Sequence, residues 1–169
     1  VAAVNHPTPT SREALLYAAH LAGKAINISK TTAAHALSYP ITVHFGIPHG
    51  HAVGLTLPRF LIYNSLVDAE DVADLRGIDY VQQRMNELYR LFAVNNAVDT
   101  AKQIELLMQN IGLETDMTIL GIKTEADRNL ILQQVNAERM KNNPRVVTTT
   151  ALYQLLITPT LSYAHSEYQ

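Results

Sequence analysis

The stretch His35-Ala-Leu-Ser-Tyr-Pro-Ile-Thr-Val-His44-Phe-Gly-Ile-Pro-His49-Gly-His51 is the most informative part of this chain. It holds four of the seven histidines in the sequence, and their neighbours are mostly small or apolar, unlike those of a solvated loop. Neutral imidazole is the commonest protein ligand for zinc, iron and similar metals. The stretch therefore predicts part of a metal site. It predicts only a part, because no carboxylate stands nearby to complete an iron-type ligand set.

The overall composition indicates the class of protein. The chain has 169 residues, of which 47% are apolar and 17% charged, which is enough for one folded domain with a real core. A formal net charge of -2 argues against a nucleic-acid partner. No apolar run approaches the roughly 20 residues that a membrane span needs. The absence of cysteine excludes a disulfide scaffold, a thiolate zinc site and thiolate catalysis. We expect a cytoplasmic protein with no nucleic-acid or membrane partner.

The hydrophobic pattern predicts an all-α, multi-helix domain over residues 1–158 and a loose polar tail over residues 159–169. Apolar residues recur at helical spacing in almost every long segment, and no alternating strand pattern exceeds a few residues. The helices are expected near residues 10–23, 31–39, 49–62, 79–92, 99–111, 124–141 and 148–156.

Local signals predict where these helices begin. We expect Thr10 or Ser11 to cap the first helix, since a side-chain oxygen there can accept a free backbone N–H. Asp99 or Thr100 is expected to cap the fifth helix for the same reason. The run that starts at Thr124 has the form of a capping box and predicts the start of the sixth helix.

His35 and His49 are the strongest candidates for metal ligands. His35 lies on a predicted helix of small residues that should stop or kink at Pro40. His49 begins the next helix behind Pro48, whose ring fixes the backbone, and two helices joined by such a turn can bring both imidazoles to one point. Since a catalytic metal takes about three protein ligands or more, the others must come from elsewhere. The alternative, at equal weight, is a buried histidine that simply bonds a carbonyl group.

The other two histidines of the stretch have a weaker case. His44 falls in the predicted turn and is expected to be exposed. His51 follows His49 by two positions, so on a helix its side chain points about 200° away and cannot readily share a metal with it. We expect His51 to face a substrate cleft or a partner.

Two further polar segments have both a functional and a structural interpretation. Lys30 and Thr31 stand before a predicted helix N-terminus, where free N–H groups favour an anion such as a substrate group. The alternative there is an ordinary helix cap. Arg145, in the turn between the last two helices, is interpreted as a structural residue that ties the turn to helix carbonyls or to a carboxylate.

Taken together, these segments resemble the metal-binding signature of the iron-containing (group III) alcohol dehydrogenases. The specific element is a histidine, followed fourteen residues later by the histidine of Pro-His-Gly and then by an apolar helix. The segments that carry the resemblance are Ala34-His35-Ala-Leu-Ser-Tyr39-Pro40, Ile47-Pro48-His49-Gly50-His51-Ala52, Leu57-Pro58-Arg59, Tyr63-Asn64, Gly112-Leu113, Leu120-Gly121-Ile122 and Asn143-Pro144-Arg145.

The resemblance implies a C-terminal helical domain that follows an N-terminal α/β domain for NAD or NADP. In that family one Asp and three His hold Fe(II) or Zn(II), and His35 and His49 would be the last two ligands. The first two would lie upstream, and the start Val1-Ala-Ala-Val-Asn, without Met or a signal peptide, fits a chain that begins within a longer protein. Tyr39 stands where several relatives carry a second histidine suspected of proton transfer. A tyrosine in that place can still hydrogen-bond and relay a proton, but an unperturbed tyrosine pKa of about 10 makes it a poor base at neutral pH. The alternative relay is His51 or a water chain.

The resemblance also implies an enzyme: a metal- and NAD(P)-dependent alcohol dehydrogenase or aldehyde reductase acting on a small alcohol or aldehyde. A homo-oligomer such as a dimer is expected, and the chain alone is expected to be inactive. One alternative is a phosphonoacetaldehyde reductase, because an anion site at Lys30 and Thr31 would suit a phosphonate. The others are a helical assembly fragment without catalysis and a relative of dehydroquinate synthase, which also uses histidine ligands and NAD.

Overall fold

The computed structural model describes residues 1–158, and within them the ordered elements are all helices. This confirms the all-α prediction, whereas the predicted tail lies outside the described residues. In chain order the helices are α1 (Ala2–Asn5), α2 (Pro9–Ser29), α3 (Ala33–Phe45), α4 (His49–Ser65), α5 (Ile78–Leu91), α6 (Ala97–Asn110), α7 (Glu125–Gln134), α8 (Ala137–Met140) and α9 (Thr149–Ile157).

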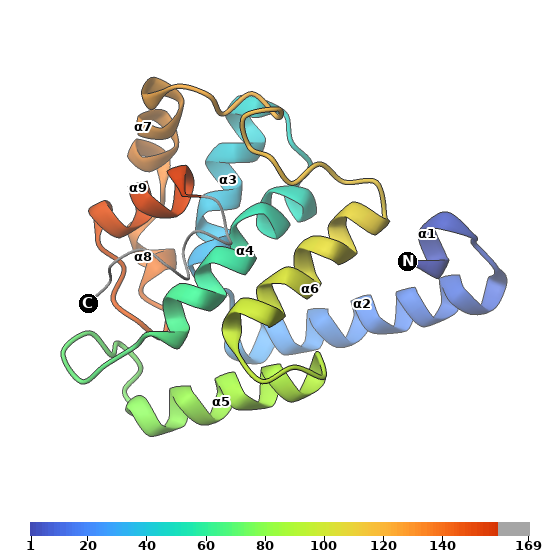
Figure 1. Ribbon diagram of the computed structural model, residues 1–169, viewed down its shortest axis with the longest axis horizontal. Helices are drawn as coiled ribbons and strands as arrows, with labels where there is room; N and C mark the ends of the chain where they lie inside the picture. Colours follow the sequence, from blue (N-terminus) through green and yellow to red (C-terminus); the bar gives the residue numbers. More distant parts are fainter. Residues whose placement is uncertain (159–169) are drawn as a thin grey trace.

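Helix α4 lies at the centre of the molecule. It contacts α3, α6 and α9, while α7 and α8 pack on α3 (Figure 1). Ten of its 17 residues are buried. The Arg59 guanidinium donates to the carbonyl oxygen of Leu155 at 2.6 Å, which holds the last turn of α9 on α4. The largest fully buried apolar side chains include Leu37, Ile41, Phe60, Ile122, Ile131 and Leu155.

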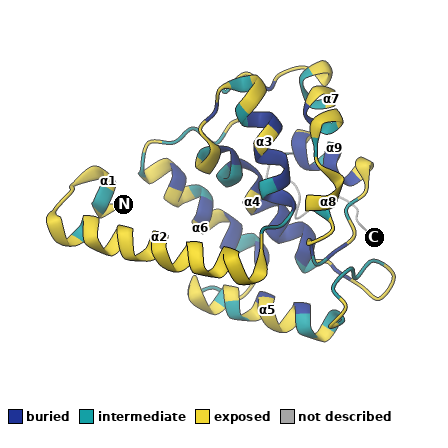
Figure 2. Ribbon diagram, turned by 180° about the vertical axis from the view of Figure 1, so that it is seen from behind, coloured by how far each residue is buried: buried dark blue, intermediate teal, exposed yellow. Residues whose placement is uncertain are grey.

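Helix α2 is the opposite case, because none of its 21 residues is buried. It runs along the outside of the described structure and is exposed over almost its whole length (Figure 2). Several of its apolar side chains face solvent, among them Leu16 and Ile28. Its helical form therefore comes from its cap and its propensity rather than from core packing.

The first predicted helix, which is α2 in the structure, begins earlier and ends later than its sequence signals predicted. Thr8, rather than Thr10 or Ser11, is the cap: its side chain accepts the Ser11 backbone N–H, and the Ser11 side chain accepts the Thr8 backbone N–H. Pro9 occupies the first helical position, where its missing N–H costs nothing. The helix also continues through Gly23 to Ser29, because an isolated glycine in a helix costs only about 1 kcal/mol.

The structure also decides the predictions made for Pro40 and for the cap of α6. Pro40 lies inside α3 instead of ending it, and the helix stops where Gly46 adopts a left-handed conformation with φ of 67°. Pro40 is itself buried, so its packing offsets the backbone hydrogen bond that it cannot make. Asn96, rather than Asp99 or Thr100, caps α6 by accepting the Asp99 N–H at 2.8 Å.

The C-terminal signals were more accurate. The Thr124 capping box is confirmed, since its side chain accepts the Asp127 N–H and the Asp127 carboxylate accepts the Thr124 N–H. The helix that it opens ends at Gln134, however, and α8 is a separate single turn. Thr148 caps α9, close to the predicted start.

Candidate metal half-site

Helices α3 and α4 bring His35 and His49 side by side. The centres of the two imidazole rings lie 5.4 Å apart in an edge-on arrangement, with an angle of 64° between the ring planes. His35 is partly buried near the start of α3, and His49 is exposed as the first residue of α4. Pro48, in an extended conformation before α4, fixes the point from which the His49 side chain leaves the backbone.

The pair fits two ligands of one tetrahedral ion. A bond of about 2.0 Å from metal to nitrogen, extended by roughly 1.1 Å to the ring centre, places two ring centres about 5 Å apart at a tetrahedral angle. The observed separation of 5.4 Å agrees with this value. Within residues 1–158 no third His, Cys, Asp or Glu side chain joins the pair to make a metal-binding group. Metal binding by His35 and His49 therefore stays a prediction, and the other ligands that it requires are not among the described residues.

Ser38 fixes the orientation and the tautomer of His49. Its side chain is fully buried, and its Oγ donates to the His35 carbonyl oxygen at 2.7 Å. The same Oγ lies 3.2 Å from His49 Nδ1. Because the one hydroxyl hydrogen is given to the carbonyl, Oγ accepts from Nδ1–H, and this leaves the Nε2 lone pair of His49 free for a ligand.

The electrostatic surroundings favour the neutral form of His35. Burial lowers the pKa of the His35 imidazole, and positive charge on His49 lowers that pKa further. A metal ligand must be a neutral imidazole, so both effects favour the binding form.

Tyr39 also lies at the pair. Its ring centre is 5.3 Å from that of His49, and its side chain is 43% exposed. The Arg139 guanidinium stacks on the Tyr39 ring, with its Cζ atom 4.3 Å from the ring centre. The Tyr39 ring therefore lies beside His49, and the catalytic role of Tyr39 stays a prediction.

The other two histidines of the stretch lie apart from the pair. The Nε2 atom of His51 is 2.6 Å from the carbonyl oxygen of Glu114, in the segment after α6. This position agrees with the expected divergence from His49, and the catalytic role of His51 stays a prediction. His44 lies in the last turn of α3, and its exposure is confirmed.

Lys30 and Thr31 lie at the junction of α2 and α3. Lys30 ends α2 with a positive φ of 61°, and it lines a cavity of about 650 Å³ together with Leu57 and Arg76. That cavity does not include the histidine pair. The Thr31 carbonyl oxygen accepts from Asn142 at 3.0 Å. The anion-binding role of Lys30 and Thr31 therefore stays a prediction.

The structural interpretation of the Asn-Pro-Arg turn agrees with its contacts. Arg145 Nε donates to the Asp71 carboxylate at 2.5 Å, and Nη1 donates to the Tyr63 carbonyl oxygen at 2.9 Å. The Asn143 side-chain amide donates to that of Asn64 at 2.8 Å, in a buried pair. These bonds tie the turn to the C-terminal end of α4. Arg145 thus bonds both a helix carbonyl and a carboxylate, the two kinds of partner that were predicted for it.

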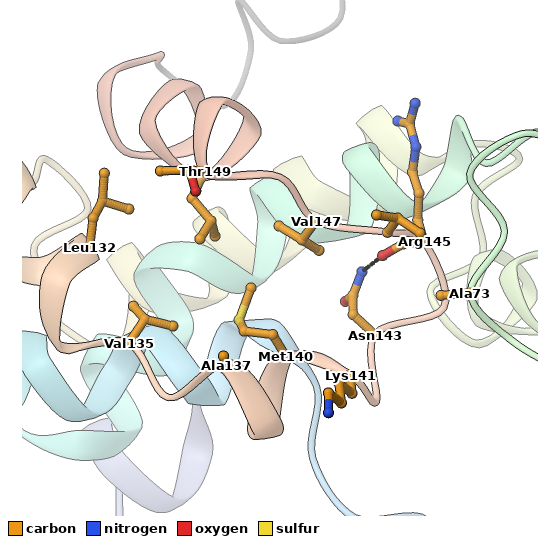
Figure 3. Close-up of a pocket in the computed structure, with 12 residues that line it drawn as sticks. Ala73, Leu132, Val135, Ala137, Met140, Lys141, Asn143, Arg145, Val147 and Thr149 are labelled. Carbon is orange, nitrogen blue, oxygen red and sulfur yellow. Dashed lines mark hydrogen bonds between the residues drawn. The ribbon is translucent and has the colours of Figure 1, made fainter.

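A second cavity lies next to this turn, away from the histidines. It measures about 470 Å³ and is enclosed mainly by apolar side chains from α7, α8, α9 and the turn between α8 and α9 (Figure 3). Asn143 is one of the lining residues, and its side-chain amide donates to the Arg145 carbonyl oxygen at 2.7 Å. Neither His35 nor His49 lines this cavity, so it is separate from the half-site.

Sequence reasoning missed Ser38 and Arg139. A usable signal existed for Ser38, because a serine one turn after His35 in an otherwise apolar helix needs a partner when it is buried. No local signal pointed to Arg139, which joins Tyr39 only through the tertiary packing of α8 on α3.

None of the helices in residues 1–158 is long and apolar enough to cross a membrane. Against known families, residues 1–159 match the model of the Fe-containing alcohol dehydrogenase family, C-terminal region.

Several curated proteins are similar to the chain. A phosphonoacetaldehyde reductase of Streptomyces viridochromogenes is 37% identical over 150 residues, which cover 89% of this chain and 37% of that protein. A 1,3-propanediol dehydrogenase of Klebsiella pneumoniae is 31% identical over 69% of the chain and 29% of its own length. A sulfoacetaldehyde reductase of Bilophila wadsworthia is 24% identical over 90% of the chain and 39% of its own length. The chain thus spans less than half the length of these relatives, and it belongs to the Fe-containing alcohol dehydrogenase family.

Proposed function

We propose that this chain is the helical metal-binding part of a metal- and NAD(P)-dependent alcohol dehydrogenase or aldehyde reductase. The observation that carries the proposal is the pairing of His35 and His49 at 5.4 Å, with the Nε2 lone pair of His49 left free by Ser38. Family membership supports an oxidoreductase of this type. Fe(II) or Zn(II), when bound, would polarise the carbonyl or alkoxide oxygen as a Lewis acid while hydride passes to or from the nicotinamide.

The residues of this chain would then have distinct roles. His35 and His49 bind the ion, and Ser38 holds His49 in the tautomer that can do so. The Tyr39 hydroxyl, on a ring beside His49, relays a proton between the substrate oxygen and solvent. His51 is the weaker candidate for this relay, because its Nε2 atom is already engaged by the Glu114 carbonyl oxygen.

The substrate is a small alcohol or aldehyde. The relatives' names include a phosphonate-bearing and a sulfonate-bearing aldehyde, and this supports the phosphonoacetaldehyde reductase alternative. In that alternative, Lys30 and Thr31 are the anion-binding residues predicted from sequence. The exposed apolar side chains of α2 support association into a homo-oligomer such as a dimer. The location that we propose for the enzyme is the cytoplasm.

Replacement of His49 in the full protein tests the proposal. We expect His49→Ala to lose the bound metal and NAD(P)H-linked turnover together, because it removes one of two ligands that the chain supplies. Metal content is measured by elemental analysis and turnover by nicotinamide absorbance. His44→Ala is the matched control, since that histidine is exposed at the far end of α3. Unchanged metal stoichiometry in His49→Ala would contradict the proposal.

A further inference from the structure

We propose that Arg139 binds the anionic head group of the substrate, so that the enzyme prefers small aldehydes that carry a phosphonate or sulfonate. This inference rests on the proposed function, because it takes the histidine pair as the place where the carbonyl group is bound. It assigns the head group to Arg139 rather than to the predicted Lys30, which lines a cavity that includes neither His35 nor His49.

The first support is the position of Arg139. Its Cζ atom lies 4.3 Å from the Tyr39 ring centre, and that ring centre lies 5.3 Å from the His49 ring centre. The guanidinium and the His49 imidazole can therefore be no farther apart than the sum of these two distances. A short aldehyde with its carbonyl oxygen at the histidines and an acidic group one or two carbons away spans such a gap.

The second support is that the hydrogen-bonding capacity of Arg139 is uncommitted. Among the described residues its guanidinium makes no ion pair and no hydrogen bond, whereas Arg76, Arg84 and Arg145 each pair with a carboxylate. Stacking on Tyr39 occupies the face of the guanidinium and leaves its N–H edge open. That edge can donate two parallel hydrogen bonds to a phosphonate or sulfonate.

The third support is that the backbone of Arg139 is held in place. The Asn136 side chain accepts the N–H groups of Glu138 and Arg139 at 2.9 and 3.2 Å, which caps α8. After α8, the Asn142 side chain donates to the Ser29 carbonyl oxygen at 2.9 Å and so ties the turn to the end of α2. Because this backbone is already ordered, binding through the Arg139 side chain needs less further ordering.

The neighbouring charges and side chains agree with this role. The Glu138 carboxylate, beside Arg139 in sequence, pairs with Lys141 at 2.6 Å and is thus not the partner of Arg139. Ala137 and Met140, from the same short helix as Arg139, line the apolar cavity of Figure 3.

Substrate preference in the full, metal-loaded protein tests the inference. We would measure kcat/KM for phosphonoacetaldehyde, sulfoacetaldehyde and propanal, a neutral aldehyde of similar size. In Arg139→Gln the ratio of the anionic to the neutral kcat/KM should fall by about 100-fold, because a charge-assisted bidentate contact is lost. Arg139→Lys keeps the charge but loses the two parallel N–H donors, so its ratio should lie between those of the wild type and of Arg139→Gln. The matched control is Arg90→Gln, which removes an exposed arginine from α5 and should leave the ratio unchanged.

A binding experiment gives a second readout that needs no turnover. Titration of the protein with methylphosphonate or methanesulfonate should shift the Nε–Hε NMR signal of Arg139 and not that of Arg90. The two anions show which head group is preferred. An unchanged ratio in Arg139→Gln, or an unshifted Arg139 signal with both anions, overturns the inference. If the wild-type protein reduces none of the aldehydes, the proposed function fails instead, and the titration still decides the role of Arg139.

Discussion

The two ends of helix α4 carry residues of the same sequence signature but have opposite surroundings. At the N-terminal end His49 is exposed, and within residues 1–158 only its Nδ1 atom, which contacts Ser38, has a hydrogen-bond partner. At the C-terminal end Tyr63 and Asn64 are buried, and both are bonded to the turn that contains Asn143 and Arg145. One end is thus open to a ligand, and the other is closed by its own chain.

This difference shows how ligand-binding residues can be told from structural residues within one sequence signature. Buried polar groups must be satisfied by the protein, because an unpaired buried donor or acceptor costs about 1–3 kcal/mol. A ligand residue must instead keep a lone pair available. Substitutions at the two ends should therefore have different readouts: folding stability at the C-terminal end and metal affinity at the N-terminal end.

The largest expected effect on stability is at the closed end. Arg145→Ala removes the largely buried ion pair with Asp71 and the hydrogen bond from Arg145 to the Tyr63 carbonyl oxygen, and we expect the free energy of unfolding to fall by about 3 kcal/mol. Chemical denaturation measures this change. Arg76→Ala is the control, because its ion pair with Asp74 is formed by a side chain that is 62% exposed, and its loss should lower the free energy of unfolding far less. Equal losses in the two variants would show that the closed end is not a stabilising network.

A smaller effect, in metal affinity, is expected at the open end. Ser38→Ala removes the group that holds the His49 tautomer, and we expect metal affinity to fall by about 10-fold. Competition with a chromophoric chelator measures the affinity. Ser65→Ala is matched, because the Ser65 hydroxyl donates to a carbonyl three residues earlier, as Ser38 does, but contacts no histidine. If both serine variants bind metal alike, Ser38 has no orienting role.

The smallest effect is expected outside both ends, at the start of α7. Backbone and side-chain hydrogen bonds from Thr124 lower the pKa of the Asp127 carboxyl below 3.8. Because the folded-state pKa lies below the unfolded-state value, the contribution of Asp127 is present above pH 3.8 and is lost as the pH falls through the lower, folded-state pKa. The stability difference between wild type and Asp127→Asn should thus be constant from pH 7 to about pH 5 and shrink below that. A difference that grows on acidification would contradict this cap.

Much of the fold could be predicted because its signals are local. The helical class followed from apolar spacing, and the Thr124 capping box from four consecutive residues. Errors in the predicted helix bounds arose where neighbouring residues offered competing local signals. Thr8, Thr10 and Ser11 are all possible caps, and Pro9 decides between them by occupying the first helical position. The sequence left open whether the helix stops or kinks at Pro40, because the burial of Pro40, which offsets the lost hydrogen bond, depends on packing.

The candidate site divides in the same way. Sequence alone specifies the helices, the order of the histidines along them and the family resemblance, since these depend on residue type and spacing. Only tertiary packing decides that the His35 and His49 rings meet at 5.4 Å while His51 turns to Glu114. Packing likewise brings Arg139 to Tyr39 from a helix far along the chain. The physical reason is that hydrogen bonds and ring contacts act over a few ångströms, and only the folded core brings such distant segments that close.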